Sequence, residues 1–126
     1  MKFDKTVLVA VDFDGTLAQE LTENLFAPAI EWTKKIQGAG AKVILWSCRE
    51  GDILQKAIEA CKKQGLVFDY INEGNGLRPD SRKINADIYI DDRAIVGEID
   101  WKSFFQKALL MLKERGMLNV HSDKKN

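Results

Sequence analysis

The chain has 126 residues, 45% of them hydrophobic, and its 19 basic and 19 acidic residues cancel to a formal net charge of zero. This length suits a single domain, and the balanced charge excludes a global basic field that would hold nucleic acid non-specifically. The two cysteines, Cys48 and Cys61, show neither metal-ligand spacing nor a disulfide pattern, so we expect a reducing, cytoplasmic location.

Short apolar runs without alternation predict buried strands over residues 7–11, 43–46 and 88–90, and residues 67–71 (VFDYI) form a fourth candidate. Such runs are typical of parallel strands with helices on both faces of the sheet. The N-terminal run is interrupted by acids and is too short for a signal peptide or a membrane span. We therefore expect no membrane association.

Proline, aspartate and glycine residues mark the ends of three predicted helices: Pro28 and Gly38, Asp52 and Gly65, and Asp100 and Gly116. Aspartate is a preferred N-cap, and glycine commonly follows the last helical turn. Strands that alternate with helices predict an α/β fold with a Rossmann-like, open, mainly parallel sheet flanked by helices. We expect one domain over residues 1–118 and a disordered tail over residues 119–126.

Polar residues follow three of the predicted strands, at the edge where ligands bind in open α/β sheets. The segments are DFDGT at 12–16, SCR at 47–49 and DDR at 91–93, and Lys83 lies just ahead of the last strand. Four carboxylates, a serine hydroxyl and two arginines should therefore meet at one edge of the sheet.

The paired acids Asp12 and Asp14 point to the same side of an extended chain, and Gly15 allows a sharp turn after them. Clustered carboxylates at the edge of a core are unfavourable unless a cation compensates for their charge. Oxygen ligands with open positions for water and phosphate suit Mg²⁺. We expect Asp12, Asp14, Asp91 and Asp92 to form a magnesium site.

Phosphoryl transfer needs a nucleophile, an acid for the leaving group and positive charge around the phosphoryl oxygens. Asp12 can attack phosphorus and form an aspartyl-phosphate, while Asp14 can act as general acid and base. Ser47 offers a hydroxyl near a helix N-terminus, and Lys83 offers a point charge. The other residues that we expect to line the substrate are Thr16, Cys48, Arg49 and Arg93. Cys48 is expected to be at least half-buried.

The segments DFDGT at 12–16, LWSCRE at 45–50 and KINADIYIDDRA at 83–94 resemble the motifs of the haloacid dehalogenase (HAD) superfamily. The resemblance implies a Rossmann-like fold and a Mg²⁺-dependent phosphohydrolase with the roles given above. It also implies that Asp14 binds the metal through its backbone carbonyl. The segments before and after Ser47 are too short for a cap domain, so a capless member with an open site is expected.

The substrate stays open between a small phosphorylated molecule and a phosphorylated nucleic-acid end. The segments SCRE and IDDR resemble the phosphatase half of phage polynucleotide kinase-phosphatases, which points to the second. The zero net charge and the lack of an evident exposed aromatic platform for stacking bases favour the first. Five residues could form a basic rim for such a substrate: Arg49, Arg78, Arg82, Lys83 and Arg93. Three of them, Arg49, Arg78 and Arg82, could instead take the role of Lys83. Alternatively, Arg49 and Arg93 only neutralise nearby acids.

Two non-enzymatic functions remain as alternatives. A phosphoreceiver has a similar size and an acidic site, but the order of motifs along this chain differs from that of receivers. A catalytically idle phosphate- or metal-binding module has no such conflict. The sequence leaves the oligomeric state open.

Overall fold

A four-stranded parallel sheet forms the centre of the protein, whose computed structural model describes residues 4–119. The strands are β1 (Leu8–Asp12), β2 (Lys42–Trp46), β3 (Tyr70–Ile71) and β4 (Ile88–Ile90). The helices are α1 (Ala27–Gly38), α2 (Gly51–Lys63), α3 (Trp101–Arg115) and a short 3₁₀ helix, η1 (Asp92–Ala94). The strand order β3-β2-β1-β4 confirms the predicted α/β fold with a Rossmann-like open sheet.

The predicted strands lie where the apolar runs are. β4 coincides with the prediction, and β1 and β2 differ from it by one residue. The candidate at 67–71 contributes only Tyr70 and Ile71, because Val67 is exposed and the chain pairs with β2 only from Tyr70, three residues later. Asp12 is the register partner of Trp46, and Val11 that of Ile90, so β1, β2 and β4 end at the same edge.

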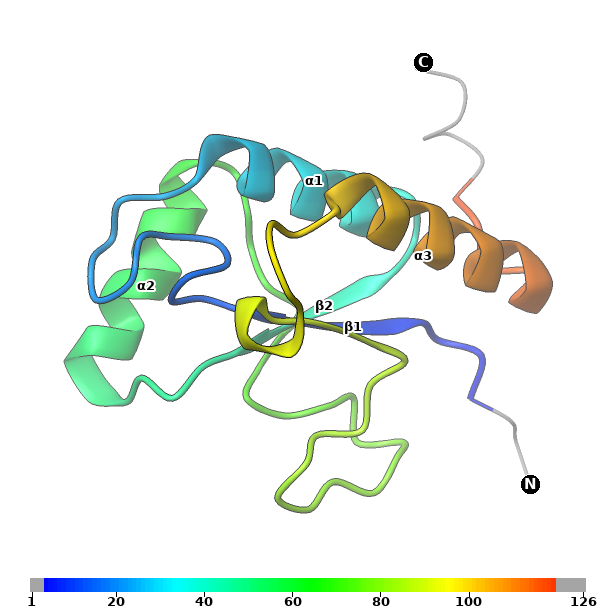
Figure 1. Ribbon diagram of the computed structural model, residues 1–126. Coiled ribbons are helices and arrows are strands. Elements are labelled where there is room, and N and C mark those ends of the chain that lie inside the picture. Colours follow the sequence, from blue (N-terminus) through cyan, green and yellow to red (C-terminus); the bar gives the residue numbers. More distant parts are fainter. Residues whose placement is uncertain (1–3, 120–126) are drawn as a thin grey trace.

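The two faces of the sheet are covered differently (Figure 1). One face packs with buried residues of all three helices, such as Ile30, Cys61 and Leu112. The other face packs with the segment between β3 and β4, which contributes Ile84 and holds no helix. The expectation of helices on both faces is therefore wrong for the described residues. No cap domain interrupts the described segments between the strands.

The helix ends follow the predicted signals in α3 and differ in α2. Asp100 caps α3 by accepting a hydrogen bond from the Ser103 backbone N–H at 3.1 Å, and Gly116 ends the helix with φ of 70°. The cap role of Asp52 is wrong, because α2 begins one residue earlier. Asp52 lies in the first turn, where its charge still favours the positive end of the helix dipole.

An ion-pair network closes the amino end of the sheet, opposite the acidic edge. Asp87 accepts hydrogen bonds from Arg78, Arg115 and the Leu8 backbone N–H at 2.9–3.0 Å. Burial alone would raise the pKa of Asp87, but these donors outweigh it and hold the pKa below its ordinary value. Arg78 also pairs with Asp4. The placement of Arg78 on a basic rim at the acidic edge is therefore wrong.

No helix in the described part of the chain is long and apolar enough to cross a membrane. The expected tail falls almost wholly on residues 120–126, which lie outside the described residues.

Candidate active site

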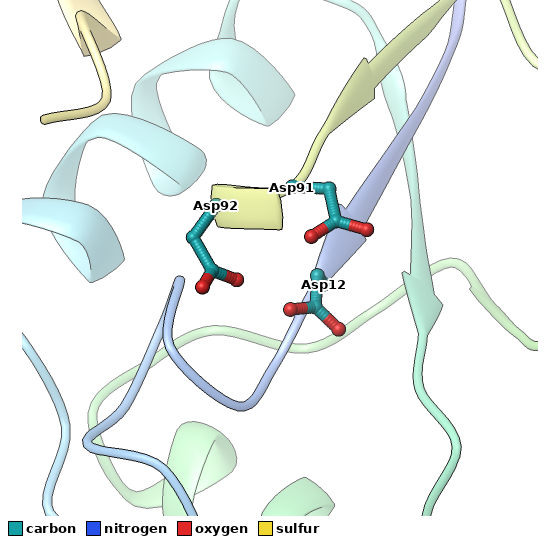
Figure 2. Close-up of side chains that lie close together, drawn as sticks. All are labelled: Asp12, Asp91 and Asp92. Atoms are coloured by element: carbon teal, nitrogen blue, oxygen red, sulfur yellow. The ribbon is translucent and has the colours of Figure 1, made fainter. Parts of the chain in front are cut away.

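Three aspartates meet at the carboxyl edge of the sheet, as Figure 2 shows. Asp12 ends β1, Asp91 follows β4, and Asp92 begins η1. One carboxylate oxygen from each lies within 4.8 Å of the others, and all three residues are half-buried. Two segments that are almost 80 residues apart in the sequence thus build one acidic cluster.

The cluster binds a proton unusually well. The pKa of Asp12 is raised to about 7, first by burial and then by the charges of Asp91 and Asp92 and a hydrogen bond with Asp92. A cation would remove this penalty, because positive charge inverts the local effect on proton affinity. The donors are all carboxylate oxygens, the ligand type that Mg²⁺ prefers, so the residues present fit that ion.

Gly15 and Thr16 hold the cluster together. Thr16 is buried, and its hydroxyl lies 3.3 Å from Asp12 Oδ2 and 3.1 Å from Asp92 Oδ1 while accepting from the Asp92 backbone N–H at 3.0 Å. A Cβ on Gly15 would lie 2.6 Å from Asp92 Oδ2, and the φ of 85° also favours glycine. Thr16 was expected to contact substrate, but the structure uses its hydroxyl to position two carboxylates.

Asp14 lies outside the cluster of three, because its carboxylate faces Arg49. Arg49 Nε donates to Asp14 Oδ2 at 2.9 Å and Nη2 donates to Oδ1 at 2.8 Å, a bidentate pair. The Arg49 hydrogen bond is the main cause that lowers the pKa of Asp14. The backbone N–H of Leu21 adds a third donor at 2.8 Å. Binding of a metal by the Asp14 carbonyl stays a prediction.

Arg49 uses its full hydrogen-bonding capacity within the protein. An arginine has five N–H donors. Besides the two bonds to Asp14, Arg49 donates to Glu23 Oε2 and the Thr22 carbonyl at 2.8 Å, and to the Ile53 carbonyl at 3.3 Å. In this arrangement no donor remains for a substrate phosphate. The structure therefore supports the alternative in which Arg49 neutralises nearby acids.

Ser47 and Cys48 follow β2 as predicted. The Ser47 hydroxyl accepts from the Arg49 backbone N–H at 3.0 Å, and its own N–H donates to Asn72 Oδ1 at 2.8 Å. The Ser47 hydroxyl keeps its hydrogen for a further acceptor such as phosphate. Cys48 is exposed, contrary to the expectation of burial, because the chain has already left the sheet at that point.

Two other predicted cations, Lys83 and Arg93, have partners other than the three aspartates of the cluster in the described structure. Lys83 is exposed, and its ammonium lies 4.9 Å from the ring centroid of Tyr89. Arg93 pairs with Glu20 at 3.3 Å, and its side chain is 80% exposed. A role for Lys83 in charge stabilisation stays a prediction, and the pairing of Arg93 with Glu20 supports neutralisation of an acid.

Sequence reasoning missed three residues around the site. Glu23 holds Arg49, Asn72 holds Ser47, and Leu21 donates to Asp14 from a backbone with φ of 63°. Asn72 also has positive φ, and asparagine directly after a strand was a usable signal because it tolerates that conformation. Leu21 and Glu23 carry no comparable local signal.

No protein-family model and no curated protein matches the chain. Among solved structures, the chain is similar to a conserved protein from Bacteroides thetaiotaomicron, with 36% sequence identity and a TM-score of 0.70. The match covers 87% of this chain and 92% of that one. This chain belongs to the same family as that conserved protein. The relationship establishes the fold, and the chemistry has to follow from the residues of the site.

Proposed function

We propose that the protein is a Mg²⁺-dependent phosphate monoester hydrolase, a capless member of the HAD superfamily that acts through an aspartyl-phosphate. The observation that carries the proposal is the cluster of Asp12, Asp91 and Asp92 at the carboxyl edge of the sheet. Such a cluster is unfavourable by itself and suits a site that takes a cation together with an anionic substrate. The two free cysteines agree with a cytoplasmic enzyme.

Asp12, Asp91 and Asp92 would hold the metal, which would offset the charge between the phosphate and the carboxylates. Asp12 attacks phosphorus, and the bond from phosphorus to the ester oxygen breaks as the alcohol leaves. Water then attacks the aspartyl-phosphate, which releases inorganic phosphate and restores Asp12.

Asp14 handles the protons of both steps. While it is paired with Arg49, Asp14 is ionised, which is the form that accepts a proton from the attacking water. Donation of a proton to the leaving oxygen requires a protonated Asp14, whose carboxyl oxygens can still accept hydrogen bonds from Arg49. Ser47 remains the candidate ligand for a phosphoryl oxygen.

The strand order favours a hydrolase over a phosphoreceiver. Receivers have a flavodoxin-like sheet with the order 2-1-3-4-5, in which the third strand lies beside the first. Here β3 lies beyond β2, and β4 carries the second acidic segment next to β1. The fold is equally compatible with a catalytically idle module, and only an activity assay distinguishes that module from a hydrolase.

A small phosphorylated substrate is favoured over a nucleic-acid end, because three of the five residues of the expected basic rim are engaged elsewhere. Arg78 lies at the opposite end of the sheet, Arg49 has used its donors, and Arg93 pairs with Glu20. Phosphate contacts from cations are what position a nucleic-acid strand, so their dispersal argues against that substrate.

The test measures phosphate release from an aryl phosphate with Mg²⁺ and with a chelator. We expect metal-dependent turnover that Asp12→Asn abolishes. Asp100→Asn is the matched control, because asparagine caps helices as well as aspartate and Asp100, the N-cap of α3, is not part of the acidic cluster. Equal turnover with chelator would contradict the metal role, and the absence of turnover would favour the idle module.

A further inference from the structure

A cleft of about 670 Å³ opens beside Asp14, the residue that handles the leaving-group proton in the proposed function. This volume is within the range of small-molecule sites. Its walls include Leu21 from the segment after β1 and Ile53 from the first turn of α2. Both are large apolar side chains with unusual exposure: 86% for Leu21 and 59% for Ile53.

The Asp14–Arg49 pair holds the backbone at Leu21 and at Ile53 by hydrogen bonds. Leu21 donates its N–H to Asp14 Oδ1, and the Ile53 carbonyl accepts from Arg49 Nη1. The φ of 63° at Leu21 is unfavourable for a residue with a Cβ, and it persists because this hydrogen bond holds it. An acid–base pair therefore holds two apolar side chains at the mouth of the cleft.

The charge of the cleft restricts what it accepts. Three carboxylates and two cations line it: Asp14, Glu23, Glu50, Arg49 and Lys56. Arg49 is already paired with two of these acids, which leaves Glu50 and Lys56 as one charge of each sign. An additional negative charge would thus meet a site with a net charge of −1, from three negative and two positive groups.

We propose that this cleft binds the leaving group of the substrate, and that Leu21 and Ile53 select phosphate esters of uncharged, apolar alcohols or phenols. The inference rests on the proposed hydrolase and specifies its substrate class. A second cleft, of about 680 Å³, lies on the Asp92 side and includes Phe26, which is 43% exposed. Its lining does not include Asp14, the proton donor of the proposed reaction.

The experiment compares kcat/KM for phenyl and 2-naphthyl phosphate, whose leaving oxygens have similar acidity but whose apolar parts differ in size. We expect Leu21→Ala and Ile53→Ala each to lower the naphthyl-to-phenyl ratio by about tenfold, the usual effect of lost apolar contact in a specificity pocket. Both side chains are exposed, so their truncation leaves the core intact. For the wild type, 4-carboxyphenyl phosphate should be a poorer substrate than phenyl phosphate.

Phe26→Ala and Leu110→Ala are the matched controls: the first lies in the other cleft, and the second is exposed on α3. Neither should change the ratio. A change with Phe26→Ala, an unchanged ratio with both Leu21→Ala and Ile53→Ala, or a preference for the carboxylated ester would overturn the inference while leaving the hydrolase intact. No turnover of any ester by the wild type would overturn the proposed function and the inference together.

Discussion

Asp12→Asn should stabilise the metal-free protein at pH 8, although it abolishes the proposed reaction. The pKa of Asp12 is raised from an ordinary 3.8 to about 7. At 1.36 kcal/mol for each pH unit, this difference sets an upper limit of about 4 kcal/mol against the ionised form. Asp12 is half-buried, and solvent screens part of the effect, so we expect about 1–2 kcal/mol.

The sign follows from proton binding. Because the folded protein binds the Asp12 proton more tightly than the unfolded chain does, this group supports stability fully below pH 4. That support is lost as the pH rises through about 7. Asparagine cannot ionise. The variant should therefore exceed the wild type in free energy of unfolding at pH 8, and the two should converge near pH 4.

Mg²⁺ should reverse this order at pH 8. A ligand that binds only the folded state at 100 times its dissociation constant adds about 2.7 kcal/mol of stability, which exceeds the expected difference. The wild type should gain this amount, and Asp12→Asn, which lacks one carboxylate of the cluster, should gain much less. Urea unfolding of both proteins at pH 4 and pH 8, with Mg²⁺ and with chelator, measures the stability difference at each pH and the gain in stability that each protein obtains from Mg²⁺. A variant that is less stable than the wild type at pH 8 without metal, or equal Mg²⁺ stabilisation of both proteins, would refute the reasoning.

Three further predictions concern the surroundings of the site and the far end of the sheet. Gly15→Ala should lower kcat about 100-fold, because its Cβ would lie 2.6 Å from Asp92 Oδ2 and displace that carboxylate, and steady-state kinetics with an aryl phosphate measures this. Asp87→Asn should cost about 2 kcal/mol of unfolding free energy at pH 7 by leaving the partly buried Arg78 and Arg115 under-paired. Because the pKa of Asp87 in the folded protein is lowered, that cost should shrink as the pH falls below 4. Urea unfolding at several pH values measures the cost, and kcat should stay unchanged. Iodoacetamide should alkylate the exposed Cys48 and spare Cys61, whose pKa burial raises to about 12, and mass spectrometry of the native protein distinguishes the two thiols.

The parts of the fold that sequence predicted are those encoded by local patterns. Unbroken apolar runs located β1, β2 and β4, and the acids directly after β1 and β4 met because parallel strands end at one edge. The cap at Asp100 and the stop at Gly116 depend on one or two residues, so they were also predictable. The coarse position of the acidic cluster followed from topology alone.

The predictions that were wrong concern contacts that depend on the tertiary structure. Arg49 lies 35 positions from Asp14, and which of the nearby acids or substrate groups it pairs with depends on how the loop after β1 returns to α2. Arg78 was assigned to the wrong end of the sheet for the same reason, since its partner Asp4 is 74 positions away. The second face lacks a helix because the segment before β4 is irregular, and no periodic pattern in the sequence predicted that this segment covers the sheet.

Asp12 and Asp14 stand two residues apart, yet their pKa values are driven in opposite directions. Asp12 meets two acids brought by β4 and η1, whereas Asp14 meets an arginine brought by the chain after β2. The two aspartates of DFDG are chemically identical in the sequence, and the segments that pack beside each of them in the fold make their environments different. One carboxylate becomes a group that benefits from a cation, and the other is held ionised and fixed in place. That division suits a reaction in which the first attacks phosphorus beside a metal and the second takes a proton from water.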